Sequence, residues 1–82
     1  MDLVALTETI IKKLVADPES VSVKEFETEE ENTIQIEVLI SADDMGRVIG
    51  KNGKTSTSIR TLIQAFAAIN NMPKVKINID SF

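Results

Sequence analysis

Two glycines three residues apart, Gly50 and Gly53, join a short apolar segment to a long amphipathic one, and this junction limits what the chain can fold into. Glycine has no Cβ, so both positions can take positive φ values and reverse the chain within a few residues. Such a turn also leaves backbone N–H groups at the start of the next helix, where the helix dipole favours an anion. Lys51 and Lys54 add positive charge at the same place. The junction therefore predicts contact with phosphate groups.

The pattern G-x-x-G alone leaves other interpretations open. A glycine-capped corner between two helices would need no ligand. A P-loop is a second alternative, because Gly53-Lys54-Thr55 matches the end of the motif G-x-x-x-x-G-K-[ST]. That motif would place a glycine where Val48 stands, and no hydrophobic strand directly precedes the loop. The P-loop is therefore disfavoured.

The residue types restrict the chemistry. At 82 residues the chain has the length of one domain, residues 1–82, with a single core. The sequence has no Cys and no His, which removes thiolate nucleophiles, the usual zinc ligands and the commonest general base. Asp43 and Asp44 are adjacent and would diverge by about 100° on a helix, and the acids at 29–31 fit a solvated loop. We therefore expect no enzyme activity, no metal site and no cofactor.

The start of the chain and its hydropathy bear on localisation. No apolar run approaches the roughly 20 residues of a membrane span, and Met1-Asp2-Leu3 lacks the basic region that opens a signal peptide. We expect a cytoplasmic protein with no membrane partner.

Charge divides the chain into two unlike parts. Residues 1–44 hold twelve acids and three bases, a balance of −9, whereas residues 45–82 hold six bases and one acid, a balance of +5. A basic patch beside the glycines is what contact with phosphates requires, while the acidic remainder weakens non-specific attraction. Two solvated faces without a ligand are the simpler alternative.

The first quarter of the chain predicts a helix and a strand. Apolar residues recur at steps of three and four over residues 2–16, which indicates an amphipathic helix, and Asp17-Pro18 ends it. From residue 21 apolar and polar residues alternate, but Phe26 is out of phase. A β-bulge near residues 24–25 would return Phe26 to the core side.

Residues 28–33 have the length and residue types of a hairpin loop, in which Asn32 can take a positive φ. The strand that follows alternates clearly, and its inward face holds Ile34, Ile36, Val38 and Ile40. Ser41 and Asp44 then have the spacing of a capping box, with Ser41 at the N-cap of a short helix.

The short helix should run to Ile49, where the glycines stop it. A long helix is predicted over residues 54–70, with a buried stripe of Ile59, Leu62, Ile63, Phe66 and Ile69. Residues 70–73, which end in Pro73, break that helix. Alternation over residues 75–79 predicts the last strand.

The order of elements predicts an α+β domain of the form αββααβ. The strands at 34–40 and 75–79 flank both later helices, so a right-handed crossover should make them parallel neighbours. The strand from residue 21 should pair antiparallel on the other side of 34–40. All three helices must then cover the one apolar face of a three-stranded mixed sheet.

The segment from Gly46 to Thr55, between a short and a long helix, resembles the glycine loop of type II KH domains, which are RNA-binding modules. The αββααβ order extends this resemblance over the whole chain. A stand-alone KH chain of this size is similar to the bacterial KhpA family, whose members share G-R-V-I-G, a basic G-x-x-G and a helix containing I-R-T. Here the last of these is Ile59-Arg60-Thr61.

The resemblance implies a binding site. In KH domains the glycine loop meets the phosphates of about four single-stranded nucleotides, and the bases lie in a shallow apolar groove. The implied backbone clamp comprises Gly50, Lys51, Asn52 and Gly53, with Lys54 as a helper. Two apolar residues are implied in the groove floor or, alternatively, in the core: Val48 and Ile49. Two arginines are implied beside the RNA path, Arg47 and Arg60, although Arg60 suits a surface or subunit contact equally well.

The sequence lacks Tyr and Trp, and no Phe lies in the glycine loop. Stacking of bases on aromatic rings, worth about 1–3 kcal/mol per base, is therefore largely absent, and a single copy should bind RNA weakly. Pairing of two domains would add avidity. The resemblance points the same way, because KhpA-like proteins self-associate and pair with a larger KH-domain protein, KhpB, also called EloR or Jag. It implies an RNA chaperone or post-transcriptional regulator that affects cell shape and envelope growth.

Three surfaces are candidates for pairing. The end of the long helix carries the small residues Ala65, Ala67 and Ala68, the strand at 75–79 is a candidate sheet edge, and Leu39 points away from the core face. Two other functions stay open. One is a KH module that binds proteins and has little RNA affinity, and the other is a DNA-binding helix-turn-helix protein.

Overall fold

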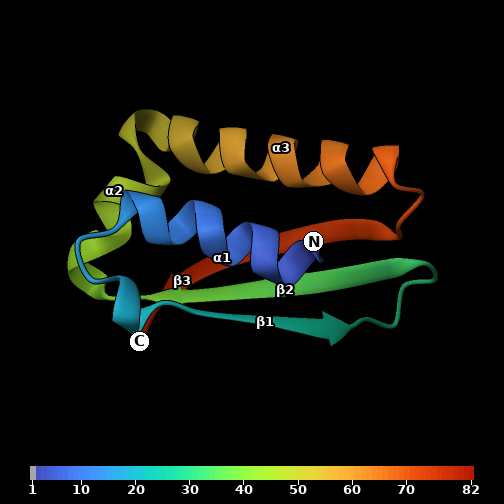
Figure 1. Cartoon of the computed structure of the whole chain (residues 1–82), viewed down its shortest axis with the longest axis horizontal. Helices are drawn as coiled ribbons and strands as arrows, with labels where there is room; N and C mark the ends of the chain where they lie inside the picture. Colours follow the sequence, from blue (N-terminus) through green and yellow to red (C-terminus); the bar gives the residue numbers. More distant parts are fainter. Residues whose placement is uncertain (1) are drawn as a thin grey trace.

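A computed structural model describes residues 2–82 and has the predicted αββααβ order. Three short 3₁₀ turns lie between these elements, at Pro18–Ser20, Ala42–Asp44 and Lys51–Gly53. Figure 1 shows the helices together on one side of the sheet, with the loop between α2 and α3 at one end and the β1–β2 hairpin loop at the other. In chain order the elements are α1 Leu3–Leu14, β1 Ser22–Glu27, β2 Thr33–Ile40, α2 Met45–Ile49, α3 Lys54–Ile69 and β3 Lys74–Ser81.

The sheet has the predicted mixed topology. Its strand order is β1-β2-β3, with β1 antiparallel and β3 parallel to the central strand β2. Val38 in β2 lies opposite Val23 of β1 and Ile79 of β3. The α2–α3 crossover between the two parallel strands therefore leaves the glycine loop at the end where β2 finishes.

The core lies between the sheet and the helices. Full burial of each large aliphatic side chain contributes about 1.5–3 kcal/mol, so β2 and β3 supply much of the stability. The buried apolar residues are Leu3, Ile11, Ile36, Val38, Ile40, Val48, Ile59, Ile63, Ala67, Val75, Ile77 and Ile79.

The prediction of a bulge in β1 was wrong. Pairing runs without interruption from Ser22 opposite Leu39 to Glu27 opposite Ile34, and Phe26 pairs with Gln35. Phe26 therefore lies on the outward face of the sheet and is 49% exposed. Glu27, at an inward-facing position next to it, is also exposed. Because the helices do not cover this end of β1, turning Phe26 inward would bury little surface.

The predicted buried stripe of α3 was partly wrong. Ile59 and Ile63 face the core as expected, and Ala67 continues their row. Leu62 is 54% exposed and Ile69 is 80% exposed. Leu62 lies about 100° round the helix from Ile63, so only one of the two rows can face the sheet.

Candidate nucleic-acid interface

The glycine loop has an unusual backbone conformation. Gly50 has φ 77° and ψ 177°, a region that only glycine enters readily. Asn52 and Gly53 follow in the left-handed region, with φ values of 57° and 73°. The N–H of Gly50 donates to Gly46 O at 3.0 Å, which ends α2, and the N–H of Gly53 donates to Gly50 O at 3.3 Å. The predicted positive φ values of both glycines are confirmed.

The two glycines are required for different reasons. A Cβ on Gly50 would lie 2.2 Å from Thr55 Oγ1, so the loop and the first turn of α3 are in direct contact there. A Cβ on Gly53 would meet only Ser56 Oγ, at 3.9 Å. Gly53 is therefore needed for its backbone conformation, whereas Gly50 is needed for both conformation and space.

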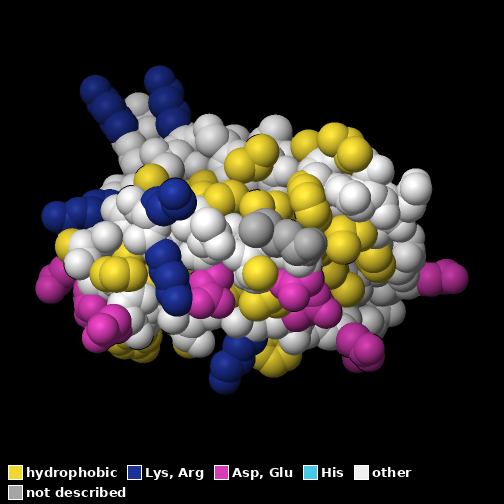
Figure 2. All heavy atoms as spheres, viewed as in Figure 1, with side chains coloured by type: hydrophobic (Ala, Val, Ile, Leu, Met, Phe, Trp, Pro, Cys, Tyr) yellow, Lys and Arg dark blue, Asp and Glu magenta, His cyan; other side chains and the backbone are white. Residues whose placement is uncertain are grey.

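The polar residues of the loop face solvent. Lys51, Asn52 and Lys54 are all exposed. Figure 2 shows Lys and Arg side chains projecting from the end of the molecule where Figure 1 places the loop between α2 and α3. Because α3 is 16 residues long, the positive end of its dipole adds to this charge. The arrangement suits an anion at the N-terminus of α3.

The structure separates the two apolar residues of the predicted site. Val48 is completely buried and belongs to the core, whereas Ile49 is half-buried and packs against the core from the surface. Of the pair, only Ile49 reaches a surface that a ligand can touch.

Arg47 lies one turn before the loop and is held by Asp44. This contact was not predicted from the sequence. Its Nη1 donates to Asp44 Oδ1 at 3.2 Å and to Asp43 O at 3.3 Å. The Arg47 side chain stays 56% exposed, whereas that of Asp44 is 3% exposed. One terminal nitrogen of the guanidinium is therefore held, and more than half of the side chain stays open to solvent.

The predicted capping box at Ser41 was partly right, because Ser41 is the N-cap residue of the 3₁₀ turn Ala42–Asp44 that leads into α2. The Ser41 side chain makes no capping hydrogen bond, and the Asp44 carboxylate instead accepts hydrogen bonds from the N–H groups of Ala16 and Asp17. The hydrogen bond from Ala16 is the main reason that the pKa of Asp44 lies below its usual range, because it outweighs the effect of burial; Asp17 and Arg47 add to it. A long-range contact replaces the expected local one.

Arg60 lies along the seam between α3 and β3. Its Nε donates to Ile77 O at 3.3 Å, and one turn later Gln64 Nε2 donates to Val75 O at 3.3 Å. Arg60 is thus half-buried beside the strand rather than within the glycine loop. The role of Gln64 was missed, although its i,i+4 spacing from Arg60 could have indicated a shared partner.

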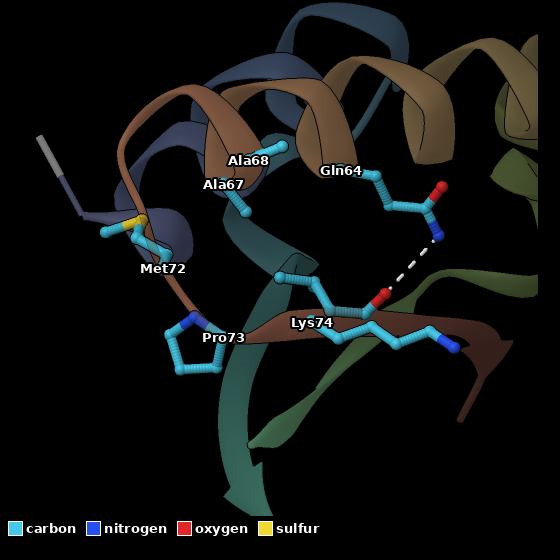
Figure 3. Close-up of a pocket in the computed structure, with 7 residues that line it drawn as sticks. Gln64, Ala67, Ala68, Met72, Pro73 and Lys74 are labelled. Carbon is cyan, nitrogen blue, oxygen red and sulfur yellow. Dashed lines mark hydrogen bonds between the residues drawn. The ribbon is translucent and has the colours of Figure 1, made fainter.

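A hollow of about 430 Å³ lies at the far end of this seam. Figure 3 shows Gln64 above β3, with its hydrogen bond drawn, and Met72 and Pro73 at the turn between α3 and β3. Gln64 is eleven residues beyond Gly53, about 16 Å along the helix, so the hollow is separate from the loop. The lining residues are Gln64, Ala67, Ala68, Met72, Pro73, Lys74 and Val75.

The exposed flank of α3 carries a second apolar row, here called the outer stripe. Its members are spaced by three, one and three residues, which puts them on one side of the helix. They lie well away from Arg60 and Gln64, and Figure 2 shows yellow side chains gathered over α3. The three alanines predicted as a pairing surface therefore lie in different places. Ala65 belongs to this row, Ala67 is buried and Ala68 lines the hollow. The outer stripe consists of Leu62, Ala65, Phe66 and Ile69, of which Phe66 is half-buried and also packs against the edge of the core.

Two other kinds of site are missing from the described part of the chain. Within residues 2–82 no group of three or more acidic side chains is arranged to hold a metal ion. Over the same residues, no helix has the length and apolar character needed to cross a membrane.

Sequence comparison gives one family. A family model described as KhpA/KhpB, KH domain, matches residues 4–79. The chain is 46% identical over 74 residues to the RNA-binding protein KhpA of Clostridium perfringens, covering 90% of this chain and 95% of that protein. It is 40% identical over 74 residues to the RNA-binding protein KhpA of Caldanaerobacter subterraneus, with the same coverage. A third relative, the RNA-binding protein KhpA of Chlamydia caviae, is 43% identical over 70 residues, which cover 85% of this chain and 86% of that protein.

Structural comparison gives the same fold inside larger proteins. The whole chain superposes on part of Aquifex aeolicus Era bound to GDP·AlF4⁻, with a TM-score of 0.64 and 18% identity, and spans 32% of that chain. A structure of Era in complex with MgGDPNP and nucleotides 1506–1542 of 16S ribosomal RNA matches with a TM-score of 0.60 and 20% identity, covering 99% of this chain and 31% of that one. At these identities the likeness concerns the fold.

Proposed function

The chain belongs to the KhpA/KhpB KH-domain family, a family of RNA-binding proteins rather than of enzymes, and we propose that it binds short single-stranded RNA at its glycine loop. The observation that carries the proposal is the loop itself. Gly50, Asn52 and Gly53 all have positive φ values, and Lys51 and Lys54 are exposed on either side of Asn52 and Gly53. The dipole of α3 and the two lysine side chains favour a phosphate at this place, and the glycines let it come close to the backbone.

The bases would lie against a surface with little chemical specificity. Ile49 is the half-buried apolar residue nearest to the loop in sequence, and the chain has no Tyr or Trp on which a base could stack. Without stacking, the affinity comes mostly from phosphate contacts, which do not read sequence. One domain should therefore bind weakly and tolerate many sequences.

The direct test replaces Lys51→Asp together with Asn52→Asp. Two carboxylates at the phosphate site would repel the RNA backbone while both glycines stay in place. We expect RNA affinity to fall at least about tenfold, equivalent to about 1.4 kcal/mol, with an unchanged circular dichroism spectrum. A matched control is Lys24→Asp, which changes an exposed lysine on β1 to the same acid. Wild-type binding by the loop variant would show that the loop is not the clamp.

We propose further that two copies pair through the outer stripe. Leu62 and Ile69 are each more than half exposed, and an apolar row of this kind suits contact with another helix. β3 is less favoured as the interface, because Arg60 and Gln64 already donate to carbonyl groups of this edge strand. Pairing along the outer stripe would bring two glycine loops to one RNA and raise its affinity by avidity.

In the cell we propose an RNA chaperone or post-transcriptional regulator that acts in the cytoplasm, alone or with a larger KH-domain partner of the KhpB, EloR or Jag kind. Membership of the KhpA/KhpB family supports this role. Effects on cell shape and envelope growth would follow from the RNAs that it regulates. Crosslinking the protein to RNA in cells and sequencing the recovered RNA would test the role, and recovery of no RNA above a loop-variant control would contradict it.

A protein-interaction module with little RNA affinity is the second candidate. The acidic balance of residues 1–44 and the outer stripe favour it. Titration with single-stranded RNA at two salt concentrations separates the two functions, because only an RNA-binding protein gives saturable, salt-dependent binding. A DNA-binding helix-turn-helix is disfavoured, because β2 and β3 flank α2 and α3 and pair with each other. Strong preference for duplex DNA in the same titration would revive it.

A further inference from the structure

Asp44 is a buried acid outside the glycine loop, and its contacts connect three parts of the chain. It is 2% exposed. Its Oδ1 accepts from Ala16 N at 3.0 Å and its Oδ2 from Asp17 N at 3.2 Å. These two N–H groups follow the end of α1, whereas Asp44 directly precedes α2. One carboxylate therefore holds the start of α2 against the end of α1.

The same carboxylate also holds Arg47. Arg47 Nη1 lies 3.2 Å from Asp44 Oδ1 and 3.3 Å from Asp43 O, so one nitrogen of the guanidinium makes both contacts. A guanidinium carries five N–H donors in a planar fork. The contacts therefore hold the fork at Nη1 and leave Nε and Nη2 able to meet a phosphate.

We propose that Asp44 is a positioning residue for RNA binding, and that it holds the Arg47 guanidinium where it meets a phosphate beyond the one in the glycine loop. This inference rests on the proposed function. The Arg47 side chain is 56% exposed, and its contacts reach back to residues 43 and 44 at the start of α2. A fixed guanidinium there offers a second phosphate contact at the end of α2 opposite the glycine loop. An arginine that is already oriented loses less side-chain freedom on binding than a mobile one.

Asp43 is the matched control for Asp44. It is the adjacent acid, it is exposed, and it contacts Arg47 only through its backbone carbonyl. Asp43→Asn and Asp44→Asn each remove one negative charge near the RNA. Electrostatics alone predicts slightly tighter RNA binding for both variants. Positioning predicts opposite signs, since Asp44→Asn also loses the charge that pairs with Arg47 and leaves one acceptor oxygen for the three donors Ala16 N, Asp17 N and Arg47 Nη1.

The experiment measures the affinity of one single-stranded RNA for wild type, Asp43→Asn, Asp44→Asn, Arg47→Ala and the double variant Asp44→Asn with Arg47→Ala. We expect binding by Asp43→Asn to be unchanged or up to about twofold tighter, and binding by Asp44→Asn to be about three- to tenfold weaker. The log–log salt slope of Asp44→Asn should become shallower by about 0.7, the value of one lost contact. In the Arg47→Ala background, Asp44→Asn should no longer weaken binding and should show only the small electrostatic effect expected of Asp43→Asn.

Folding is controlled by circular dichroism and urea unfolding of each variant. If Asp44→Asn does not fold, Arg47→Lys serves instead, because it keeps the charge and loses the planar fork; it should weaken RNA binding at wild-type stability. Equal binding by Asp44→Asn and Asp43→Asn, or wild-type binding by Arg47→Lys, would overturn the inference. If the loop variant Lys51→Asp with Asn52→Asp binds RNA normally, the proposed function itself fails, which is a distinct result.

Discussion

Thr55 occupies the space that any side chain on Gly50 would need. A Cβ on Gly50 would lie 2.2 Å from Thr55 Oγ1 and 2.7 Å from Thr55 Cβ. The end of α2 and the first turn of α3 therefore touch across the glycine loop, and the sharp turn between them depends on the absence of one carbon atom.

The first prediction concerns Gly50→Ala. The new methyl group would clash with Thr55, and the backbone would stay at a φ of 77° with ψ near 180°. Steric overlap and backbone strain each cost about 1–3 kcal/mol, so we expect a loss of about 2–4 kcal/mol in the free energy of unfolding. Urea unfolding measures it.

The matched control is Gly46→Ala. A Cβ on Gly46, which lies within α2, would meet nothing within 4 Å. Helix propensity then favours alanine by about 0.5–1 kcal/mol. Equal stability of the Gly50→Ala and Gly46→Ala variants would contradict the positive φ of Gly50 and its close contact with Thr55.

The second prediction concerns the salt dependence of RNA binding. Lys51 and Lys54 are exposed at the loop, and Arg47 and Arg60 lie farther along the proposed path. With a slope of about −0.7 for each single-strand phosphate contact, one domain should give a log–log slope of about −1 to −3. Lys51→Ala should make the slope shallower by about 0.7, whereas Lys24→Ala on β1 should leave it unchanged. A slope near zero for wild type would rule out a phosphate clamp.

The third prediction concerns pairing. Leu62→Glu places a charge within the outer stripe and should convert a dimer into a monomer, whereas Ala68→Glu, on another flank of the same helix, should remain dimeric. Light scattering at micromolar concentration gives the mass. A wild-type protein that is strictly monomeric and binds RNA equally well alone would disprove pairing.

The fourth prediction concerns acid stability. The pKa of Asp44 is lowered in the folded protein, so its stabilising contribution is present above the unfolded pKa of about 3.9 and is lost as pH falls through the folded value. The stability difference between wild type and Asp44→Asn should therefore be largest near neutral pH and shrink below about pH 4. Urea unfolding over this pH range tests it, and a constant difference would show that the charge of Asp44 does not contribute.

Most of the fold could be predicted from the sequence, because local patterns determine it. Alternation gave the strands around Ile36 and Ile77, and their separation by two helices gave the parallel pairing. The loop conformation at Gly50 and Gly53 was predicted from residue type, because few other residues can adopt it.

The errors have a common physical cause, since each depends on contacts between distant residues. Periodicity identifies apolar residues on α3 but does not say which of two adjacent rows meets the sheet, and Leu62 and Ile69 were assigned to the wrong one. Asp44 has the spacing of a local cap, yet it bonds to N–H groups 27 and 28 residues away. A bulge was predicted near Phe26 because the sequence does not show that the helices leave this end of β1 uncovered.

The hydrogen bonds within the glycine loop have a consequence for the entropy of binding. The N–H of Gly53 donates to Gly50 O, and Ser56 Oγ donates to Gly53 O at 3.1 Å. Ordering the backbone of one residue costs about 1–2 kcal/mol, and here that cost is met when the protein folds. A ligand that arrives at the loop does not have to immobilise it, so a few phosphate contacts without stacking can still give measurable affinity.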